Sequence, residues 1–469
     1  MTFVVLAATA ASFSLMQSLI TPVLPTIQHD LHTSGTAVTW VLTAWLLSAS
    51  VATPLLGRIG DMIGKDRTLL IALGSIALGC LVAALAPNIG VLIAARMIQG
   101  LGSAAFPAAF GIIRDEFPPQ RVASAVGMLS AVIATGGGLG VVLAGPIVGA
   151  LDWRWLFWIP MIVVLVVAAL AFRYVPASPI RTPGRVNWLA AVLLSGWLVA
   201  LLLPLSKATA WGWAAPTTIG LFVLAAALLA GWLAVELRST NPLIDMRMMR
   251  LPAVWTTNLV ALLFGAGMFA VYAFLPQLMQ TPTASGYGFG ASVTTSGLLM
   301  LPMLVTMAAG GSLSGPLSTR IAGKTQLIFG STLTAASSAL FALQHDAPWK
   351  VATSGAIFGL GLGLVFACLV NLIVQSVPPS QTGVASGMNA NIRTIGASIG
   401  IAVVSSIITA HTQPTGLPTE SGYTTSFLLL AMVGAAATAL AVLVPTPRQA
   451  PQPVTVPAEL VPELTPAEV

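Results

Sequence analysis

Long apolar runs alternate with short polar segments along almost the whole 469-residue chain. About 20 helical residues cross the hydrocarbon core of a bilayer, and each run reaches that length. We therefore predict an all-α membrane protein with fourteen spans, at about residues 3–27, 37–57, 68–87, 90–113, 123–150, 155–173, 187–206, 214–236, 252–279, 291–317, 325–343, 350–376, 383–410 and 423–444. Residues 445–469 are rich in Pro, Glu and Thr and lack apolar periodicity, so we predict a disordered tail.

Composition supports a lipid environment, since 57% of residues are hydrophobic and only 7% are charged, with a mean hydropathy of +0.93. A soluble domain carries about 25% charged residues. The pI of 9.8 does not indicate nucleic acid, because the basic residues are scattered over short loops. Both cysteines, Cys80 and Cys368, lie in apolar runs, so we expect neither a disulfide framework nor a metal site. The first run has no charge and no basic leader, and we interpret it as a span rather than a signal peptide.

The basic residues predict the orientation, because cytoplasmic loops collect Lys and Arg. If the N-terminus is cytoplasmic, the basic residues outside the helices all fall on the cytoplasmic side except Arg154, Lys207 and Lys350. One helix more or fewer would invert every later loop and remove this asymmetry. We therefore expect a multi-pass protein of the cell membrane with both termini in the cytoplasm.

An internal repeat divides the chain. The segment FPAAFGIIRDEFPPQRVASAVG (106–127) is similar to FACLVNLIVQSVPPSQTGVASG (366–387), and GRIGDMIGKD (57–66) is similar to GPLSTRIAGK (315–324). The repeat predicts two six-helix bundles, 1–180 and 252–444, separated by two linking helices at 187–236. Two parallel six-helix halves with a substrate site between them are typical of the major facilitator fold.

The stretch GRIGDMIGKDR (57–67) resembles the signature of the loop between helices 2 and 3 in the major facilitator superfamily. Gly57, Asp61, Gly64, Lys65 and Arg67 carry the match. The resemblance implies a cytoplasmic latch that favours one access state. Asp61 could accept hydrogen bonds from the N-terminus of a neighbouring helix, whose dipole favours an anion. The alternative is that these charges only set the topology.

The predicted helix 4 contains AARMIQGLGSAAFPAA (94–109), which is similar to a family motif through Arg96, Gly100 and Gly102, with Gln99 beside them. A charge within a span is costly unless it is paired or hydrated. We therefore expect Arg96, Gln99 and Ser103 to form one polar stripe that faces the cavity. The alternative is that Arg96 snorkels to the membrane interface.

The predicted helix 5 contains GGGLGVVLAGPIVGA (136–150), which resembles the antiporter motif imperfectly. One register uses Gly136, Gly140 and Gly145, and a shifted register uses Gly145 and Pro146. Close helix packing alone would also need such small residues.

Further matches follow in order from helix 1 to helix 13, and together they resemble the fourteen-helix drug:proton antiporters. This resemblance implies export of drug-like or antibiotic molecules with the proton gradient as the driving force, by a monomer without a cofactor. The alternative is a nutrient importer or symporter on the same fold. The sequence has no nucleotide-binding P-loop, HExxH or nucleophile elbow, so we do not expect an enzyme.

The sequence departs from that family in its acids, none of which lies at the centre of a predicted span. Met16 stands where many of these antiporters carry an Asp, and Gln17 is adjacent. With Arg96 and Arg393 in spans and no central acid, we expect a neutral or anionic substrate rather than a strong cation. The acid that would carry protons stays open among Asp61, Asp115 and Glu116. The candidate cavity residues are Gln17, Thr21, Asn258, Tyr272, Asn389 and Arg393, although interhelical hydrogen bonding would explain each of them as well.

Overall fold

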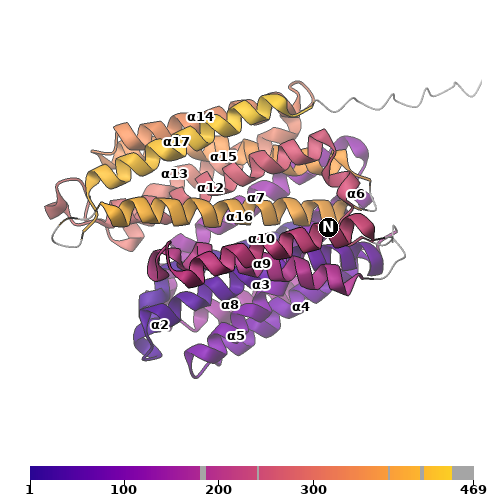
Figure 1. Cartoon of the computed structure of the whole chain (residues 1–469), viewed down its shortest axis with the longest axis horizontal. Coiled ribbons are helices and arrows are strands. Elements are labelled where there is room, and N and C mark those ends of the chain that lie inside the picture. Colours follow the sequence, from indigo (N-terminus) through magenta and orange to yellow (C-terminus); the bar gives the residue numbers. More distant parts are fainter. Residues whose placement is uncertain (180–185, 240–241, 379–380, 412, 414–416, 446–469) are drawn as a thin grey trace, which may run out of the picture.

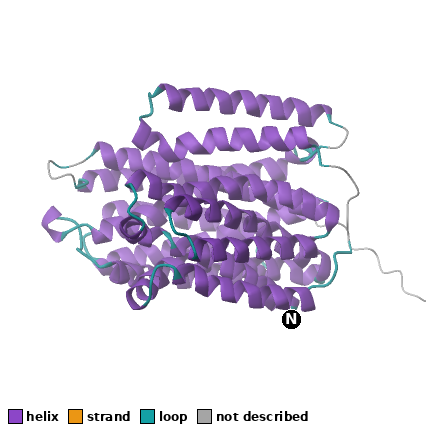
Figure 2. Ribbon diagram, turned by 90° about the horizontal axis from the view of Figure 1, so that it is seen from below, coloured by secondary structure: helices purple, strands orange, loops and turns teal. Residues whose placement is uncertain are grey.

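A computed structural model describes residues 1–179, 186–239, 242–378, 381–411, 413 and 417–445. The regular elements in this part of the chain are helices, and the long ones run side by side (Figure 2). Fourteen of the helical segments are long and apolar enough to cross a membrane. This confirms the predicted fold class and the number of spans. The predicted tail lies outside the described residues from residue 446 onward.

The N-terminal bundle comprises the first six spans. Its elements are α1 (Thr2–Leu19), η1 (Thr21–Val23), α2 (Leu24–Asp30), α3 (Gly35–Ile63), α4 (Lys65–Ala84), α5 (Ile89–Gly100), η2 (Leu101–Ala104), α6 (Ala105–Glu116), α7 (Pro119–Ala150) and α8 (Trp155–Tyr174). The segments α5, η2 and α6 together form the fourth span. The first predicted span, 3–27, is interrupted by η1, where Pro22 cannot donate a backbone hydrogen bond.

The linking segment consists of α9 (Trp188–Trp211), α10 (Pro216–Arg238) and α11 (Met246–Met249). The C-terminal bundle follows, with α12 (Pro252–Gln280), η3 (Thr283–Ser285), α13 (Val293–Leu317), α14 (Gly323–Leu343), α15 (Pro348–Ser376), α16 (Thr382–Ala410) and α17 (Glu420–Leu443).

The helices of both bundles end at two opposite faces of the molecule, which we call the terminal face and the opposite face. The hydroxyl of Thr2 donates to the carbonyl oxygen of Tyr174 at 3.2 Å, so α1 begins where α8 ends. The terminal face also carries the turn between α3 and α4 and the start of α16. In Figure 1 the N-terminus and α6 lie at this end, and α2 lies at the other.

The two bundles meet along two seams, α3 against α16 and α7 against α13. Glycines let the backbones approach in both seams. A Cβ atom added to Gly57 would lie 2.9 Å from the carbonyl oxygen of Gly383, and one added to Gly127 would lie 2.9 Å from that of Gly311.

The helix α9 lies against both α3 and α16, and Figure 1 shows α9 and α10 beside this seam. The contact is largely apolar, and the same apolar cluster includes Trp197 of α9 and Trp232 of α10, whose ring centres are 6.2 Å apart. At the end of the hairpin, the indole N–H of Trp213 donates to the hydroxyl of Ser406 at 2.8 Å. The linking helices therefore contact both bundles.

The stretch 57–67 was predicted as a loop, and this is wrong. Helix α3 continues to Ile63 and α4 begins at Lys65, so Gly64 alone makes the turn, with φ at +113°. Glycine adopts this conformation without a steric penalty. The charged side chains consequently lie on helix ends, where Asp61 and Lys65 are each only 2% exposed.

Candidate functional site

A cavity of about 130 Å³ lies between the two bundles. Aromatic and small polar side chains from α1, α3, the fourth span, α12 and α16 line it, and Arg393 is the only charged residue among the described ones that do so. The lining comprises Phe13, Gln17, Trp45, Leu46, Ala49, Ser50, Thr53, Ser103, Phe106, Phe269, Ala390, Asn391, Arg393, Thr394, Ala397, Ser398 and Ile401. Such a mixture of aromatic walls and a few polar groups is typical of small-molecule sites.

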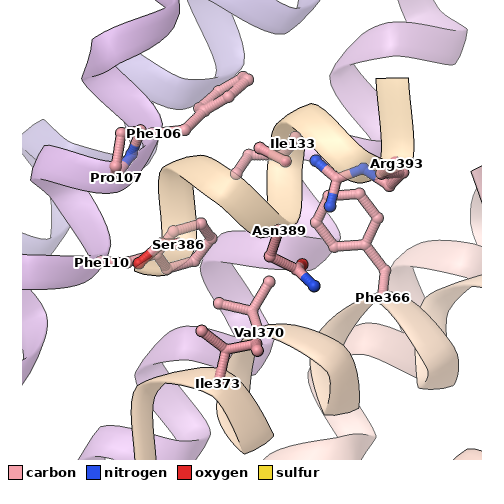
Figure 3. Close-up of a pocket in the computed structure, with 11 residues that line it drawn as sticks. Phe106, Pro107, Phe110, Ile133, Phe366, Val370, Ile373, Ser386, Asn389 and Arg393 are labelled. Atoms are coloured by element: carbon pink, nitrogen blue, oxygen red, sulfur yellow. The ribbon is translucent and has the colours of Figure 1, made fainter. Parts of the chain in front are cut away.

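Toward the terminal face the cavity narrows to a space of about 10 Å³, which is room for about one water molecule. Phe106, Ala390 and Arg393 line both spaces, so the narrow space begins where the cavity ends. Figure 3 shows Phe106, Phe110, Val370 and Ile373 closing around it, with Asn389 and Arg393 reaching in from α16.

Asp61 joins the two bundles between this constriction and the terminal face. Its carboxylate accepts a hydrogen bond of 3.3 Å from the backbone N–H of Val384, in the first turn of α16. The acid of one bundle thus caps a helix of the other bundle, at the end where the helix dipole favours a negative charge. The second carboxylate oxygen is buried without a hydrogen-bond partner.

Arg114, at the end of α6, makes the second contact between the bundles. Its guanidinium donates to the hydroxyl of Thr382 and to the carbonyl oxygen of Val377, both at 2.7 Å. Arg114 was not predicted as a site residue. Its place in the repeated segment 106–127 was the available signal.

Two buried asparagines add to this closure. The Asn391 amide donates to the carbonyl oxygen of Ser50 at 2.7 Å, and the Asn371 amide donates to that of Ala123 at 3.2 Å. Neither asparagine was predicted as a site residue, although both lie in segments that carried the repeat or the family resemblance. The Asn371 bond joins the bundles on the terminal side of the cavity, as Asp61 and Arg114 do. The Asn391 bond joins them at the cavity itself, because Asn391 and Ser50 both line it.

The other predicted latch residues act within the N-terminal bundle. Lys65 forms a buried ion pair with Asp115 of α6. Gly111 makes room for its stem, because a Cβ there would lie 2.6 Å from the Lys65 Cδ. Arg67 is exposed. Of the five predicted residues, Gly57 and Asp61 therefore contact the other bundle.

Arg96 does not face the cavity, which corrects the expectation from its sequence. It is fully buried inside the N-terminal bundle, so it does not snorkel either. Its Nε donates to the carbonyl oxygen of Val41 at 3.2 Å, and a terminal nitrogen donates to the Gln99 side chain at 2.6 Å. The guanidinium lies 5.5 Å from the centre of the Trp45 ring, which does line the cavity. The polar side of α5 therefore faces α3, where the Val41 carbonyl accepts from Arg96, and Arg96 packs against the side of Trp45 that is turned away from the cavity.

The motif glycines of the fourth span make close packing possible. A Cβ on Gly100 would lie 2.6 Å from the Ser48 Cβ, and one on Gly102 would lie 2.7 Å from the Ile76 Cδ1.

The three motif glycines of α7 differ in how closely they are packed. A Cβ on Gly136 would lie 3.2 Å from Ser14 of α1, and one on Gly140 would lie 3.1 Å from the Leu19 nitrogen. Gly145 has no neighbour closer than 3.7 Å. Pro146 lies inside α7. The first two glycines therefore seat α7 against α1.

Two of the six candidate cavity residues, Gln17 and Arg393, line the main cavity. Asn389 lines the constriction, and its amide donates to Asn258 at 2.8 Å, so Asn258 lies behind it. The remaining two, Tyr272 and Thr21, line neither space: the Tyr272 hydroxyl contacts the Met307 sulfur at 3.1 Å, and Thr21 is exposed at the start of η1.

Comparison with known proteins gives matches over most of the chain. The Major Facilitator Superfamily family model matches residues 6–401. The chain is 31% identical over 389 residues to the tetracenomycin C resistance and export protein of Streptomyces glaucescens, covering 81% of this chain and 70% of that protein. It is also 31% identical over 396 residues to the methylenomycin A resistance protein of Streptomyces coelicolor, covering 82% of this chain and 80% of that protein.

Among solved structures, the proton:xylose symporter XylE has a similar fold. The TM-score is 0.68 at 14% sequence identity, and 95% of each chain is covered. At this identity the similarity concerns the fold alone.

Proposed function

The chain belongs to the Major Facilitator Superfamily, and we propose that it exports drug-like or antibiotic small molecules across the cell membrane by alternating access. The observation that carries this proposal is the aromatic-lined cavity between the bundles, which is sealed toward one face by Asp61 and Arg114. The names of the two Streptomyces relatives, which refer to export and antibiotic resistance, support the outward direction.

We orient the terminal face, with both chain termini, toward the cytoplasm. The distribution of basic residues supports this orientation, because Arg58, Arg67, Arg114, Arg121 and Arg173 all lie near this face. In this orientation the closed face is cytoplasmic, so we assign the structure to a state in which Asp61 and Arg114 close the cytoplasmic side of the cavity. Release of substrate from this state would be to the outside.

The driving force in this proposal is the proton-motive force. No acid is among the described residues of the cavity lining, so a proton would have to act elsewhere. Asp61 is the strongest candidate, because protonation would remove the negative charge that caps α16 and would weaken the closed face. One chain contains the whole cavity, which supports a monomer as the working unit.

The second candidate is a nutrient importer, since a proton:xylose symporter shares the fold. The lining favours a ligand with a large apolar surface, because Phe13, Trp45, Phe106 and Phe269 present flat apolar faces.

Drug susceptibility with and without an uncoupler tests the proposal. A susceptible bacterium that expresses the protein is compared with an empty-vector strain over a panel of aromatic antibiotics and dyes. We expect a raised inhibitory concentration for at least one compound, together with efflux that the uncoupler abolishes. Unchanged susceptibility over the panel with uptake of a nutrient would favour the importer instead.

A further inference from the structure

We propose that Arg393 binds an anionic group, such as a carboxylate or phenolate, on an aromatic substrate, and that transport therefore moves net negative charge outward. The inference rests on the proposed function and names the substrate class of the same cavity. It starts from the unusual surroundings of this side chain within the bundle.

Arg393 differs from the other two inward arginines in its partners. Arg114 donates two hydrogen bonds across the bundles, and Arg96 donates two within its own bundle. The Arg393 guanidinium makes no hydrogen bond or ion pair with the described residues. Its contact is the ring of Phe366, whose centre lies 4.4 Å from the guanidinium carbon. Figure 3 shows this arrangement.

A cation at this depth is costly unless it is hydrated or paired. The Phe366 ring offsets part of that cost through a cation–π contact, but it leaves the N–H donors unused. A guanidinium presents its donors in a planar fork that matches the two oxygens of a carboxylate. The unused donors therefore favour a ligand with acceptor oxygens and a negative charge.

The backbone fixes where Arg393 stands. A Cβ on Gly265 of α12 would lie 2.9 Å from the Arg393 carbonyl carbon, so the two helices are in direct backbone contact at this level. The side chain is thus presented at the junction of the cavity and the constriction. An anion bound there would sit at the end of the path that is closed in this state.

The cavity walls select the rest of the ligand. The rings of Phe13 and Phe106 meet edge to face at 5.0 Å, and Phe13 and Trp45 are 5.9 Å apart. Phe269 contributes a further ring to the same lining. Such surfaces favour a planar aromatic body, while Arg393 holds its anionic end.

The charge of the ligand has a consequence for energetics. A cytoplasm that is negative by 100 mV supports about a 50-fold outward gradient of a monoanion, equivalent to about 2.3 kcal/mol. The electrical part of the proton-motive force therefore acts directly on the substrate, without a carboxylate in the cavity.

Three fluorescent probes of the same shape test the assignment on purified protein: 9-anthracenecarboxylate, its neutral carboxamide and the cationic 9-(aminomethyl)anthracene. We expect wild-type protein to bind the carboxylate at least 10-fold more tightly than the other two. Arg393→Gln should lose this preference while keeping its affinity for the carboxamide, which also reports correct folding. Arg393→Lys should retain part of the preference. Arg320→Gln, at an exposed position outside the cavity, should match wild type.

Flux in proteoliposomes then tests the charge that moves. With no pH gradient, a potassium diffusion potential set by valinomycin should drive the carboxylate, and reversing the potential should reverse the flux. Equal binding of the three probes by wild type, an unchanged preference in Arg393→Gln, or flux that ignores the potential would each overturn the proposal. Loss of export in cells with the binding preference intact would instead count against the proposed function.

Discussion

Asp61 and Val384 belong to opposite bundles and are joined by a hydrogen bond from the Val384 backbone N–H to the Asp61 carboxylate, at 3.3 Å. The carboxylate comes this close because residue 383 is a glycine, on which a Cβ would lie 2.8 Å from the Asp61 Oδ1. The bond exists only while the bundles are closed on the terminal side. Asp61 therefore ties a single charge to the conformational state of the molecule.

Replacing this carboxylate tests whether the charge of Asp61 stabilises the closed terminal face. Asp61→Asn keeps the size of the side chain but removes the charge at the start of α16, which we expect to cost the closed terminal face about 1–2 kcal/mol. Transport should fall to background while expression stays at the wild-type level. Flux in proteoliposomes and the amount of purified protein measure the two quantities. Wild-type flux in this variant would indicate that the charges of residues 57–67 only set the membrane topology.

Asp66 provides the matched control, since it lies five residues further on at the start of α4. Its carboxylate accepts a hydrogen bond of 3.0 Å from the backbone of Ser178 within the N-terminal bundle. Asp66→Asn should therefore leave flux within about twofold of wild type, because the bond adds about 1 kcal/mol and does not join the bundles.

The buried pair of Lys65 and Asp115 should govern stability rather than access. Asp115→Asn removes the carboxylate that is paired with the buried Lys65 ammonium, which costs about 3–5 kcal/mol. We expect a clear fall in the melting temperature of the detergent-solubilised protein. Removing both charges, in Lys65→Met with Asp115→Asn, should recover much of the loss, and Lys65→Met alone completes the cycle. Additive losses in this double-mutant cycle would show that the two groups are not coupled.

The close contact between α3 and α16 leaves no room for a side chain at position 57. Gly57→Ala places a methyl group 2.9 Å from the Gly383 carbonyl oxygen, so the bundles cannot close fully at the terminal face. A cysteine introduced at Ser386, which lines the constriction, should become more reactive to a polar maleimide from that side. Gly74→Ala is the control, because a Cβ there meets nothing within 4 Å. Equal labelling of the two alanine variants would contradict the role of the seam.

Arg96 should be intolerant even of lysine. A single ammonium cannot reproduce the planar fork that reaches both the Val41 carbonyl and the Gln99 side chain, so Arg96→Lys should lose about 1–3 kcal/mol of stability. Trp45 would also lose its support, and we expect weaker substrate binding at the cavity. Thermal melting and tryptophan fluorescence titration measure the two effects. A variant with wild-type melting and binding would contradict this account.

The spans could be predicted from the sequence because a lipid solvent requires about 20 apolar residues in each helix. The contact of Asp61 with a helix N-terminus could be anticipated, since an acid near the end of an apolar span has few other partners. The direction in which Arg96 points could not, because periodicity does not distinguish a stripe that faces a cavity from one that faces a neighbouring helix. The bonds of Arg114 to Thr382 and Val377 join residues more than 260 positions apart, and the repeat that contains all three does not indicate that they meet across the bundles.

The linking hairpin of α9 and α10 has a mechanical consequence for the transport cycle. Trp213 joins it to Ser406 of the C-terminal bundle by a hydrogen bond. On the other side, the Lys207 ammonium of α9 lies 5.1 Å from the centre of the Trp40 ring of α3, beside apolar contacts with that helix. The hairpin thus has a specific contact with each bundle, and a movement of one bundle relative to the other must loosen one of the two. It acts as a strap that resists this movement on one side of the molecule.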